Sequence, residues 1–249
     1  MTALALRGPV VDADVSTMMG DADADFGGAG SSASRKADRL REARERRSSE
    51  RSALGRAWAS AFPSAEDRRR LDEEGHWRTG AEGEQSLAAL LAKRCPHVPM
   101  LHDRAVPHGK ANIDHIAVAP TGVYVIDCKR YKGKIEVTTP LFGKQKLKIN
   151  GRDRTKLIDG LAKQVEHVKA ALADAEPDVP VQGCLCFVAP EGFLADVGLP
   201  VIRTLKINGY PLYYAKRLAK RLNHPGPITG AHADALQVAL GERLPPARG

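Results

Sequence analysis

The chain has 249 residues, 43% of them hydrophobic, which is enough for one ordinary domain with extensions or for two small domains. Aromatic residues make up only 5%, which argues against base stacking as the main binding device. The net charge of +8 and a pI near 9.4 indicate a partner rich in phosphate, and no apolar stretch is long enough to predict a membrane span.

The N-terminal third of the sequence is polar and charged. Residues 1–33 are mostly Ala, Asp, Gly and Ser, which predicts a disordered tail. Their start is too short for the apolar region of a signal peptide. Residues 34–77 mix Arg with Glu and Asp and predict a charged, helical extension. That extension is open to three interpretations: a solvated helix, a basic arm that contacts nucleic acid, or a segment that docks a partner protein.

Regular hydrophobic patterns begin near residue 78 and predict a compact domain over 78–222. They favour a helix over 80–94, a strand over 101–106, and a hairpin of strands 112–119 and 123–129. Shorter strands follow at 134–138 and 146–149, then an amphipathic helix over 155–174 and a fully apolar strand over 181–188.

The remaining elements are smaller. We expect strands at 201–204 and 206–214, with a turn at Asn208-Gly209, and a helix at 215–222. Residues 223–249 are expected to hold a last helix at 229–240 and a tail. The order of elements predicts an α/β fold, in which a mixed β-sheet is flanked by helices.

The hairpin places two acids opposite each other. If residues 119–122 form a simple turn, facing residues have numbers that sum to 241, and Asp114 then faces Asp127. Two carboxylates that close repel unless a cation lies between them. Lys129 shares the face of Asp127 because side chains alternate along a strand. A bulge at Gly122 would change this register.

These charges end strands that are apolar on both faces, so burying them without partners would be costly. One alternative is an internal salt bridge between Lys129 and one aspartate, which leaves the second carboxylate unexplained. In the preceding helix, Glu84 points with the apolar residues Leu87 and Leu91, whereas Glu82 should face water. Glu84 is also explained by an acid's preference for a first helical turn.

Other polar residues are more ambiguous. Gln164 lies at the edge of the apolar stripe of its helix, where it could orient a water, contact a phosphate or make a core hydrogen bond. His115 points away from Asp114 and is interpreted as a structural histidine, and His102 as a surface residue. The cysteines form no CxxC pair, so we expect reduced thiols in a cytoplasmic protein and no zinc site.

A basic run follows the hairpin and carries a charge of +8, as large as the net charge of the whole chain. It is either a solvated loop or a surface for nucleic acid. The run spans residues 129–156, and its predicted nucleic-acid-binding residues are Arg130, Lys132, Lys134, Lys144, Lys146, Lys148, Arg152, Arg154 and Lys156.

Taken in order, the motifs resemble the NERD (nuclease-related) domain of the PD-(D/E)xK nuclease superfamily. They are Gly80-Ala-Glu-Gly-Glu84, Asn112-Ile-Asp-His115, Gly122-Val-Tyr-Val-Ile-Asp-Cys-Lys129 and Lys132-Gly-Lys-Ile135. The resemblance implies a restriction-endonuclease-like fold over 78–222. The family commonly has Glu where this chain has Asp127, and an Asn-Pro expected before Gln164 is absent.

The resemblance also implies a metal-dependent nuclease that hydrolyses phosphodiester bonds, in DNA more than RNA. Its catalytic residues would be Glu84, Asp114, Asp127, Lys129 and Gln164. Asp114, Asp127 and the backbone carbonyl of Cys128 would bind Mg²⁺ or Mn²⁺, with Glu84 reaching the ion through a water. The alternative is a nucleic-acid-binding module whose catalysis is weak or lost.

Overall fold

The computed structural model describes residues 25–107, 109, 111–131, 133–141, 143–174, 176–189, 198–200 and 203–248. Residues 1–24 of the tail predicted over 1–33 lie outside this part of the chain, as do residues 201 and 202 of the strand predicted at 201–204. Among the described residues, no helix is both long and apolar enough to cross a membrane.

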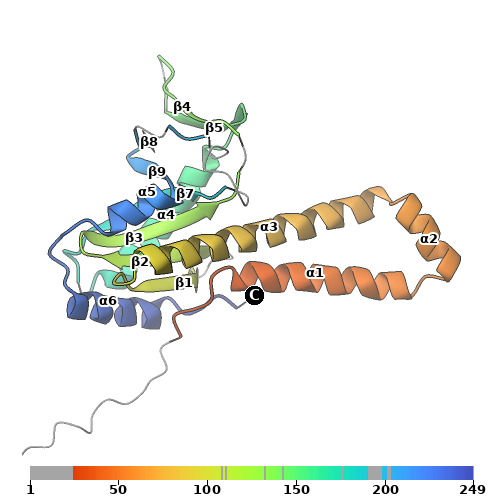
Figure 1. Ribbon diagram of the computed structural model, residues 1–249, viewed down its shortest axis with the longest axis horizontal. Coiled ribbons are helices and arrows are strands. Elements are labelled where there is room, and N and C mark those ends of the chain that lie inside the picture. Colours follow the sequence, from red (N-terminus) through yellow and green to blue (C-terminus); the bar gives the residue numbers. More distant parts are fainter. Residues whose placement is uncertain are drawn as a thin grey trace, which may run out of the picture.

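A six-stranded mixed sheet forms the centre of the molecule and confirms the predicted fold class (Figure 1). Its order is β1-β2-β3-β7-β9-β8, in which β3, β7 and β9 run parallel and the other pairs are antiparallel. The strands are β1 (Met100–Ala105), β2 (Asn112–Ala119), β3 (Gly122–Lys129), β7 (Val181–Phe187), β8 (Leu205–Ile207) and β9 (Tyr210–Tyr214).

Helices cover both faces of this sheet because β3 alternates between two apolar clusters. Val123 and Val125 pack with α4 (Lys156–Leu172) and α6 (Gly230–Arg243). Tyr124 and Ile126 pack with α3 (Ala65–Arg94) and α5 (Ala215–Leu222). Both clusters are buried, so β3 lies between two cores and its end is the place where α3 and α4 approach from opposite sides.

The basic run forms a second, three-stranded antiparallel sheet. It consists of β4 (Ile135–Thr138), β5 (Lys146–Ile149) and β6 (Arg152–Asp153). Ile135, Leu147 and Ile149 are buried in the main core, so the small sheet is anchored by its apolar residues. The prediction of two short strands here is confirmed, and β6 is an addition.

A helical arm projects from the sheet (Figure 1). It consists of α1 (Ser31–Ser49), the short α2 (Ala53–Ala61) at its tip, and the first half of α3, which returns along α1. The start of α3 is fixed by Ser64, whose hydroxyl accepts a hydrogen bond from the backbone N–H of Asp67 at 3.0 Å. We call α1, α2 and residues 65–78 the arm.

Packing adds to the predicted boundaries at three places. Helix α3 runs unbroken for 30 residues across the predicted domain start at Arg78, so Glu84 lies in mid-helix and not in a first turn. Residues 25–33, predicted as part of the tail, are ordered, because Ser31 and Ser32 bond Asp103. The last helix predicted within residues 223–249 is present as α6, and Leu236, Leu240 and Leu244 of this segment belong to the main core.

Arg104 ties both ends of the described chain to β1. Its side chain is fully buried, and its guanidinium donates to the carbonyl oxygens of Leu244, Gly241 (2.9 Å) and Asp25 (2.7 Å). Next to it, the buried carboxylate of Asp103 accepts bonds from Ser31, Ser32 and Asn112. The segment before α1 and the segment after α6 are therefore fastened to the same strand.

We predict that Arg104→Ala destabilises the protein strongly, because three backbone carbonyls lose their donor and at least one stays buried. Each unsatisfied group costs about 1–3 kcal/mol, so the free energy of unfolding should fall by about 2–4 kcal/mol. Urea denaturation measures the change. Arg243→Ala, whose side chain is exposed and bonds only its own helix, should change it by less than about 0.5 kcal/mol.

Candidate active site

The β2–β3 hairpin has the register that the sequence predicts. Ala119 pairs with Gly122 and His115 with Ile126, so the facing residues sum to 241, and one further step along this register sets Asp114 opposite Asp127. Gly122 adopts a φ of +133°, and a Cβ there would lie 2.4 Å from the carbonyl oxygen of Pro180. Only glycine fits this turn, and no bulge shifts the register.

Lys129 lies between the two carboxylates. Its ammonium donates to Asp127 Oδ1 and, at 3.1 Å, to the carbonyl oxygen of Cys128, and it lies 3.9 Å from Asp114 Oδ2. Burial acts to lower the pKa of Lys129, but the carboxylates of Asp127 and Asp114 outweigh it and raise that pKa well above its usual value. Lys129 is therefore an ammonium at every physiological pH.

Asp114 is held by the backbone of the opposite strand. Its Oδ2 accepts the N–H of Cys128 at 2.7 Å, which fixes the side chain across the end of the hairpin. Burial raises the pKa of Asp114 well above its usual value, and the nearby acids Asp127 and Glu84 add to this while Lys129 opposes it. One ammonium thus does not compensate for the acids around it.

Glu84 reaches the same place from α3. Leu87 and Leu91, one and two turns further on, pack beneath the sheet and set the rotation of the helix, as predicted. Burial and the carboxylates of Asp103 and Asp127 raise the pKa of Glu84 to about 7, although Lys129 and the backbone N–H of Gly30 act to lower it. Glu82 is exposed, also as predicted, and pairs with Arg130.

The donor set fits a hard divalent cation. Asp114, Asp127 and the Cys128 carbonyl offer oxygen ligands of the kind Mg²⁺ and Mn²⁺ prefer. Burial first, and then the neighbouring acids, raise the pKa values of Asp114 and Glu84, and a cation beside them would oppose both effects. In the described part of the chain no three His, Cys, Asp or Glu side chains form a ready cluster for a metal ion. Lys129 instead contacts both Asp127 and the Cys128 carbonyl.

Gln164 on α4 donates from Nε2 to the carbonyl oxygen of Asn112 at 3.0 Å, which links its helix to the start of β2, two residues before Asp114. Its Oε1 is buried and has no partner among the described residues. The core hydrogen bond, one of the three roles that the sequence left open for Gln164, is therefore present, and its Oε1 has no donor among the described residues.

His115 points away from the carboxylates and is fully buried, as predicted. Its Nδ1 lies 2.8 Å from Nδ1 of His102, and the two rings meet edge to face. Burial, and then the proximity of His102, lower the pKa of His115 to about 3, so its imidazole stays neutral. The expectation that His102 lies at the surface is wrong, because pairing of β1 with β2 sets it against His115.

The predicted nucleic-acid-binding residues differ in their surroundings. Four are exposed on or beside the small sheet, namely Lys144, Lys146, Arg152 and Lys156, whereas Lys148 and Arg154 are half-buried. Lys134 pairs with Glu136 at 2.8 Å. Arg130 packs on Gly83 and pairs with Glu82, so it is engaged within the protein, and Lys132 lies outside the described residues.

Comparison with known protein families now bears on this geometry. Residues 79–188 match the NERD family, described as the nuclease-related domain. This part of the chain is a NERD domain. It contains all five predicted catalytic residues and the small basic sheet, while the arm precedes it. The PD-(D/E)xK placement is consistent with that family. The curated proteins and the solved structures give no match to the chain.

Two groups near the NERD site were not predicted from the sequence. They are the carboxylate of Asp103 and the backbone N–H of Gly30, which both influence Glu84. The sequence could have indicated Asp103, because an Asp-Arg pair within a predicted strand indicates buried charges that need partners. It could not have indicated Gly30, because only the packing of the arm brings it to α3, where its Cβ position lies 2.8 Å from the carbonyl oxygen of Ala81.

The raised pKa of Glu84 predicts a pH-dependent stability. Because the folded protein holds this proton up to about pH 7 and the unfolded chain only to about 4.5, stability falls as pH rises across that window. Glu84→Gln removes this loss, so relative to wild type it should gain on the order of 2 kcal/mol between pH 5 and pH 8. Urea denaturation in EDTA measures the gain.

The control for this change is Glu82→Gln, which neutralises an exposed acid on the same helix. Its difference from wild type should stay nearly constant across the same pH range. If the two variants follow the same pH profile, then Glu84 does not carry the proton assigned to it.

Proposed function

We propose that the protein is a metal-dependent nuclease that hydrolyses phosphodiester bonds, with DNA favoured over RNA. The observation that carries the proposal is the half-buried ammonium of Lys129 between Asp114 and Asp127, with Glu84 beside them, inside a NERD domain. Three acids around one ammonium, all wholly or partly removed from water, destabilise a fold in which they have no function. Their presence therefore supports a functional site over a structural salt bridge.

Each residue then has a distinct role. Asp114, Asp127 and the Cys128 carbonyl would hold Mg²⁺ or Mn²⁺, with Glu84 bound through a water, and such an ion supplies charge neutralisation at the phosphate and acidifies a water. Lys129, always protonated, donates a hydrogen bond to the attacking water and stabilises its hydroxide form. Gln164, with a buried free oxygen, would orient that water or the substrate.

The phosphate backbone of the substrate would lie on the exposed basic side chains on and beside the small sheet, chiefly Lys144, Lys146, Arg152 and Lys156. A cytoplasmic location fits the four buried cysteines, which carry free thiols that persist under reducing conditions. The second candidate function, a nucleic-acid-binding module without catalysis, is favoured by one observation: Lys129 already contacts the oxygens of Asp127 and Cys128 that would bind the ion.

The cleavage test uses purified protein with plasmid and linear DNA, and with RNA, in Mg²⁺ or Mn²⁺. Wild type should cut, and Asp114→Asn and Lys129→Ala should each lose at least about 10²-fold in rate, because each removes a group that acts on the reacting phosphate or water. Lys169→Ala is the matched control, since Lys169 is an exposed lysine paired with Glu166 on α4. EDTA should abolish cutting.

Two outcomes would contradict the nuclease. Cleavage that persists in both active-site variants would remove these residues from the mechanism and indicate a contaminant. Salt-dependent DNA binding by wild type without cutting under any metal condition would leave the binding module as the function.

The small sheet gives a second test. The triple variant Lys144→Ala, Lys146→Ala and Arg152→Ala should bind duplex DNA more weakly at all sequences, with the slope of log affinity against log salt reduced by about 2.7, or ~0.9 for each phosphate contact. Binding is measured by fluorescence anisotropy without divalent ions. An unchanged slope would show that these residues face solvent only.

A further inference from the structure

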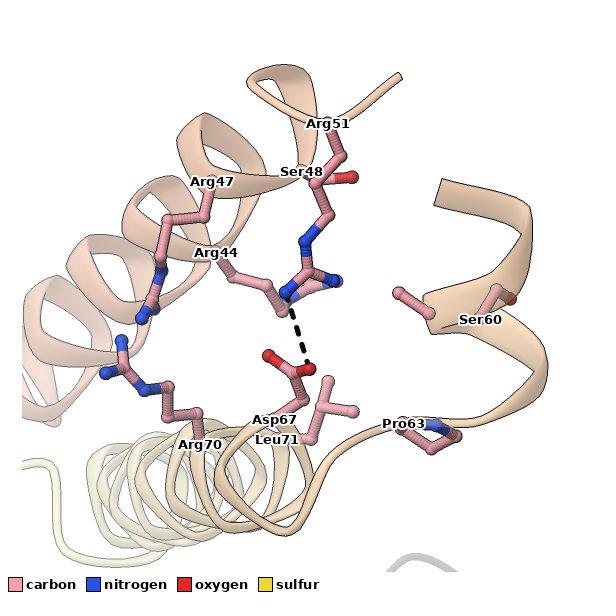
Figure 2. Close-up of a pocket in the computed structure, with 10 residues that line it drawn as sticks. Arg44, Arg47, Ser48, Arg51, Ser60, Pro63, Asp67, Arg70 and Leu71 are labelled. Carbon is pink, nitrogen blue, oxygen red and sulfur yellow. Dashed lines mark ion pairs between the residues drawn. The ribbon is translucent and has the colours of Figure 1, made fainter. Parts of the chain in front are cut away.

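The tip of the arm contains a hollow of about 350 Å³ between α1, α2 and α3. Figure 2 shows the side chains that line it. Four of them are arginines, Arg44, Arg47, Arg51 and Arg70, and the only acid among the lining residues is Asp67. The lining side chains therefore carry a formal charge of +3, and Glu66 and Glu74, each paired with one of the arginines, lower the local charge to +1. The hollow lies outside the segment that matches the NERD family, at the N-terminal end of α3 and at least thirteen residues before Glu84.

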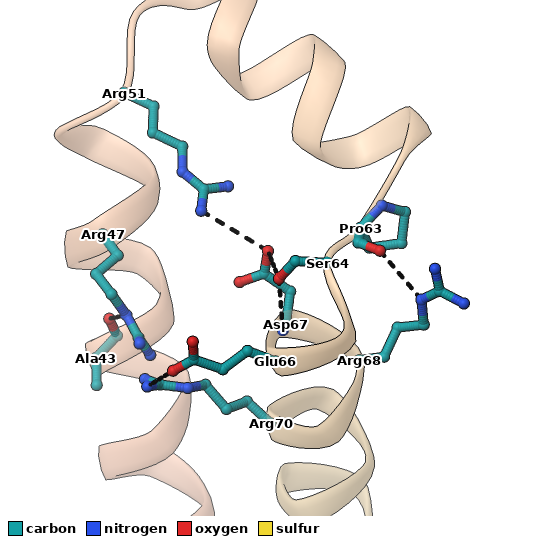
Figure 3. Close-up of polar contacts among 9 residues, drawn as sticks. All are labelled: Ala43, Arg47, Arg51, Pro63, Ser64, Glu66, Asp67, Arg68 and Arg70. Atoms are coloured by element: carbon teal, nitrogen blue, oxygen red, sulfur yellow. Dashed lines mark hydrogen bonds and ion pairs between the residues drawn. The ribbon is translucent and has the colours of Figure 1, made fainter.

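The arginines are brought together although they repel one another. Figures 2 and 3 show the guanidinium ends of Arg47 and Arg70 directed toward each other across the gap between α1 and α3. Arg47 donates a hydrogen bond from Nε to the carbonyl oxygen of Ala43, and it makes no ion pair with any described carboxylate. Such a convergence of like charges is stabilised by an anion between them.

The neighbouring acids compensate only in part. Arg44 pairs with the buried carboxylate of Glu74 at 3.1 Å. Arg70 pairs with Glu66, which is 70% exposed, and Arg51 pairs with Asp67 at 3.7 Å (Figure 3). Exposed pairs of this kind contribute little to stability, so an entering phosphate can replace them at small cost. A guanidinium also matches the geometry of a phosphate, with two parallel N–H donors for two oxygens.

Next to the hollow, α2 exposes an apolar stripe. Leu54, Trp58 and Phe62 recur at a spacing of four and are 85%, 69% and 64% exposed. The rings of Trp58 and Phe62 lie with their centroids 4.7 Å apart. Their chain neighbours Ala59 and Pro63 line the hollow, so the segment that forms one wall of the hollow also carries the aromatic pair.

We propose that the tip of the arm is a binding site for single-stranded nucleic acid, in which the hollow takes backbone phosphates and Trp58 and Phe62 stack on the adjacent bases. Arginines that track a backbone and aromatic rings that take unpaired bases are the two devices of such sites. A flat anionic membrane would contact the stripe but would not enter a hollow between three helices. A second copy of a chain with a net charge of +8 would oppose the hollow with like charge.

The site is tested with the full chain and a fluorescein-labelled oligothymidine of about 20 nucleotides, longer than the ~4–16 nucleotides such a site covers. Anisotropy is recorded in EDTA over a range of salt. The double variant Arg47→Ala and Arg70→Ala should bind at least about tenfold more weakly, and its salt slope should fall by about 1.4, or ~0.7 for each lost contact to a single strand.

Trp58→Ala should also weaken binding by roughly tenfold, but without changing the salt slope, because stacking releases no counterions. Arg46→Ala is the matched control: Arg46 is exposed on α1 beside Arg47 and does not line the hollow. It should bind within about twofold of wild type. Circular dichroism verifies that each variant folds, and Arg47→Gln replaces the double variant if that one does not.

Three results would overturn the proposal. Arg46→Ala could lose as much affinity as the hollow variants, which would leave only diffuse attraction. The variants could lose binding to phosphatidylserine vesicles and keep the oligonucleotide, which would indicate a membrane site. Trp58→Ala could convert a dimer to a monomer with oligonucleotide binding unchanged, which would indicate self-association. Because divalent ions are absent throughout, the result is separate from whether the NERD site cuts.

Discussion

Burial of charge at the end of an apolar hairpin constrains everything around it. Strands β2 and β3 are packed on both faces, and Asp114 and Asp127 come at the point where the apolar pattern stops. The sheet cannot move these carboxylates into water without breaking its register, so their compensation has to be brought to them. Lys129 and the N–H of Cys128 provide that compensation for the two aspartates, and the N–H of Gly30 provides it for Glu84. The three carboxyl groups still outnumber the one ammonium.

The same constraint reaches into the segments that surround the NERD domain. Gly30 provides a backbone N–H near Glu84, and it is positioned because Asp103 holds Ser31 and Ser32 at the start of α1. Arg104, the next residue, fastens the chain after α6. Two adjacent buried charges on β1 thus join the site to the arm and to the C-terminal segment, which both lie outside the residues that match the family.

The parts of this arrangement that are local in sequence could be predicted. Alternation fixes which face Asp127 and Lys129 share, and a tight turn fixes which residues face each other, so the acid pair followed from arithmetic on the sequence. Helix periodicity gave the rotation of Glu84 for the same reason. These features depend on neighbours within one or two elements.

What depends on distant packing was missed. The charged composition of residues 34–77 predicted a helical extension, which α1, α2 and the first half of α3 form, but it did not predict that α3 continues unbroken to Glu84. Residues 25–33 read as disordered because their partners, Asp103 and Arg104, lie about seventy residues away. His102 was assigned to the surface since nothing near it in sequence reveals His115 across the strand pair.

The continuity of α3 has a mechanical consequence for nucleic acid. Arg70 and Glu84 are fourteen residues apart in one unbroken helix, so they are separated by about 21 Å along its axis and by only ~40° around it. A flexible linker would let the arm and the NERD domain sample many separations, whereas a helix fixes one. A strand held at both places would therefore be held at a set distance from the point of chemistry, and the length of α3, a part of the chain without an apolar pattern, would determine that distance.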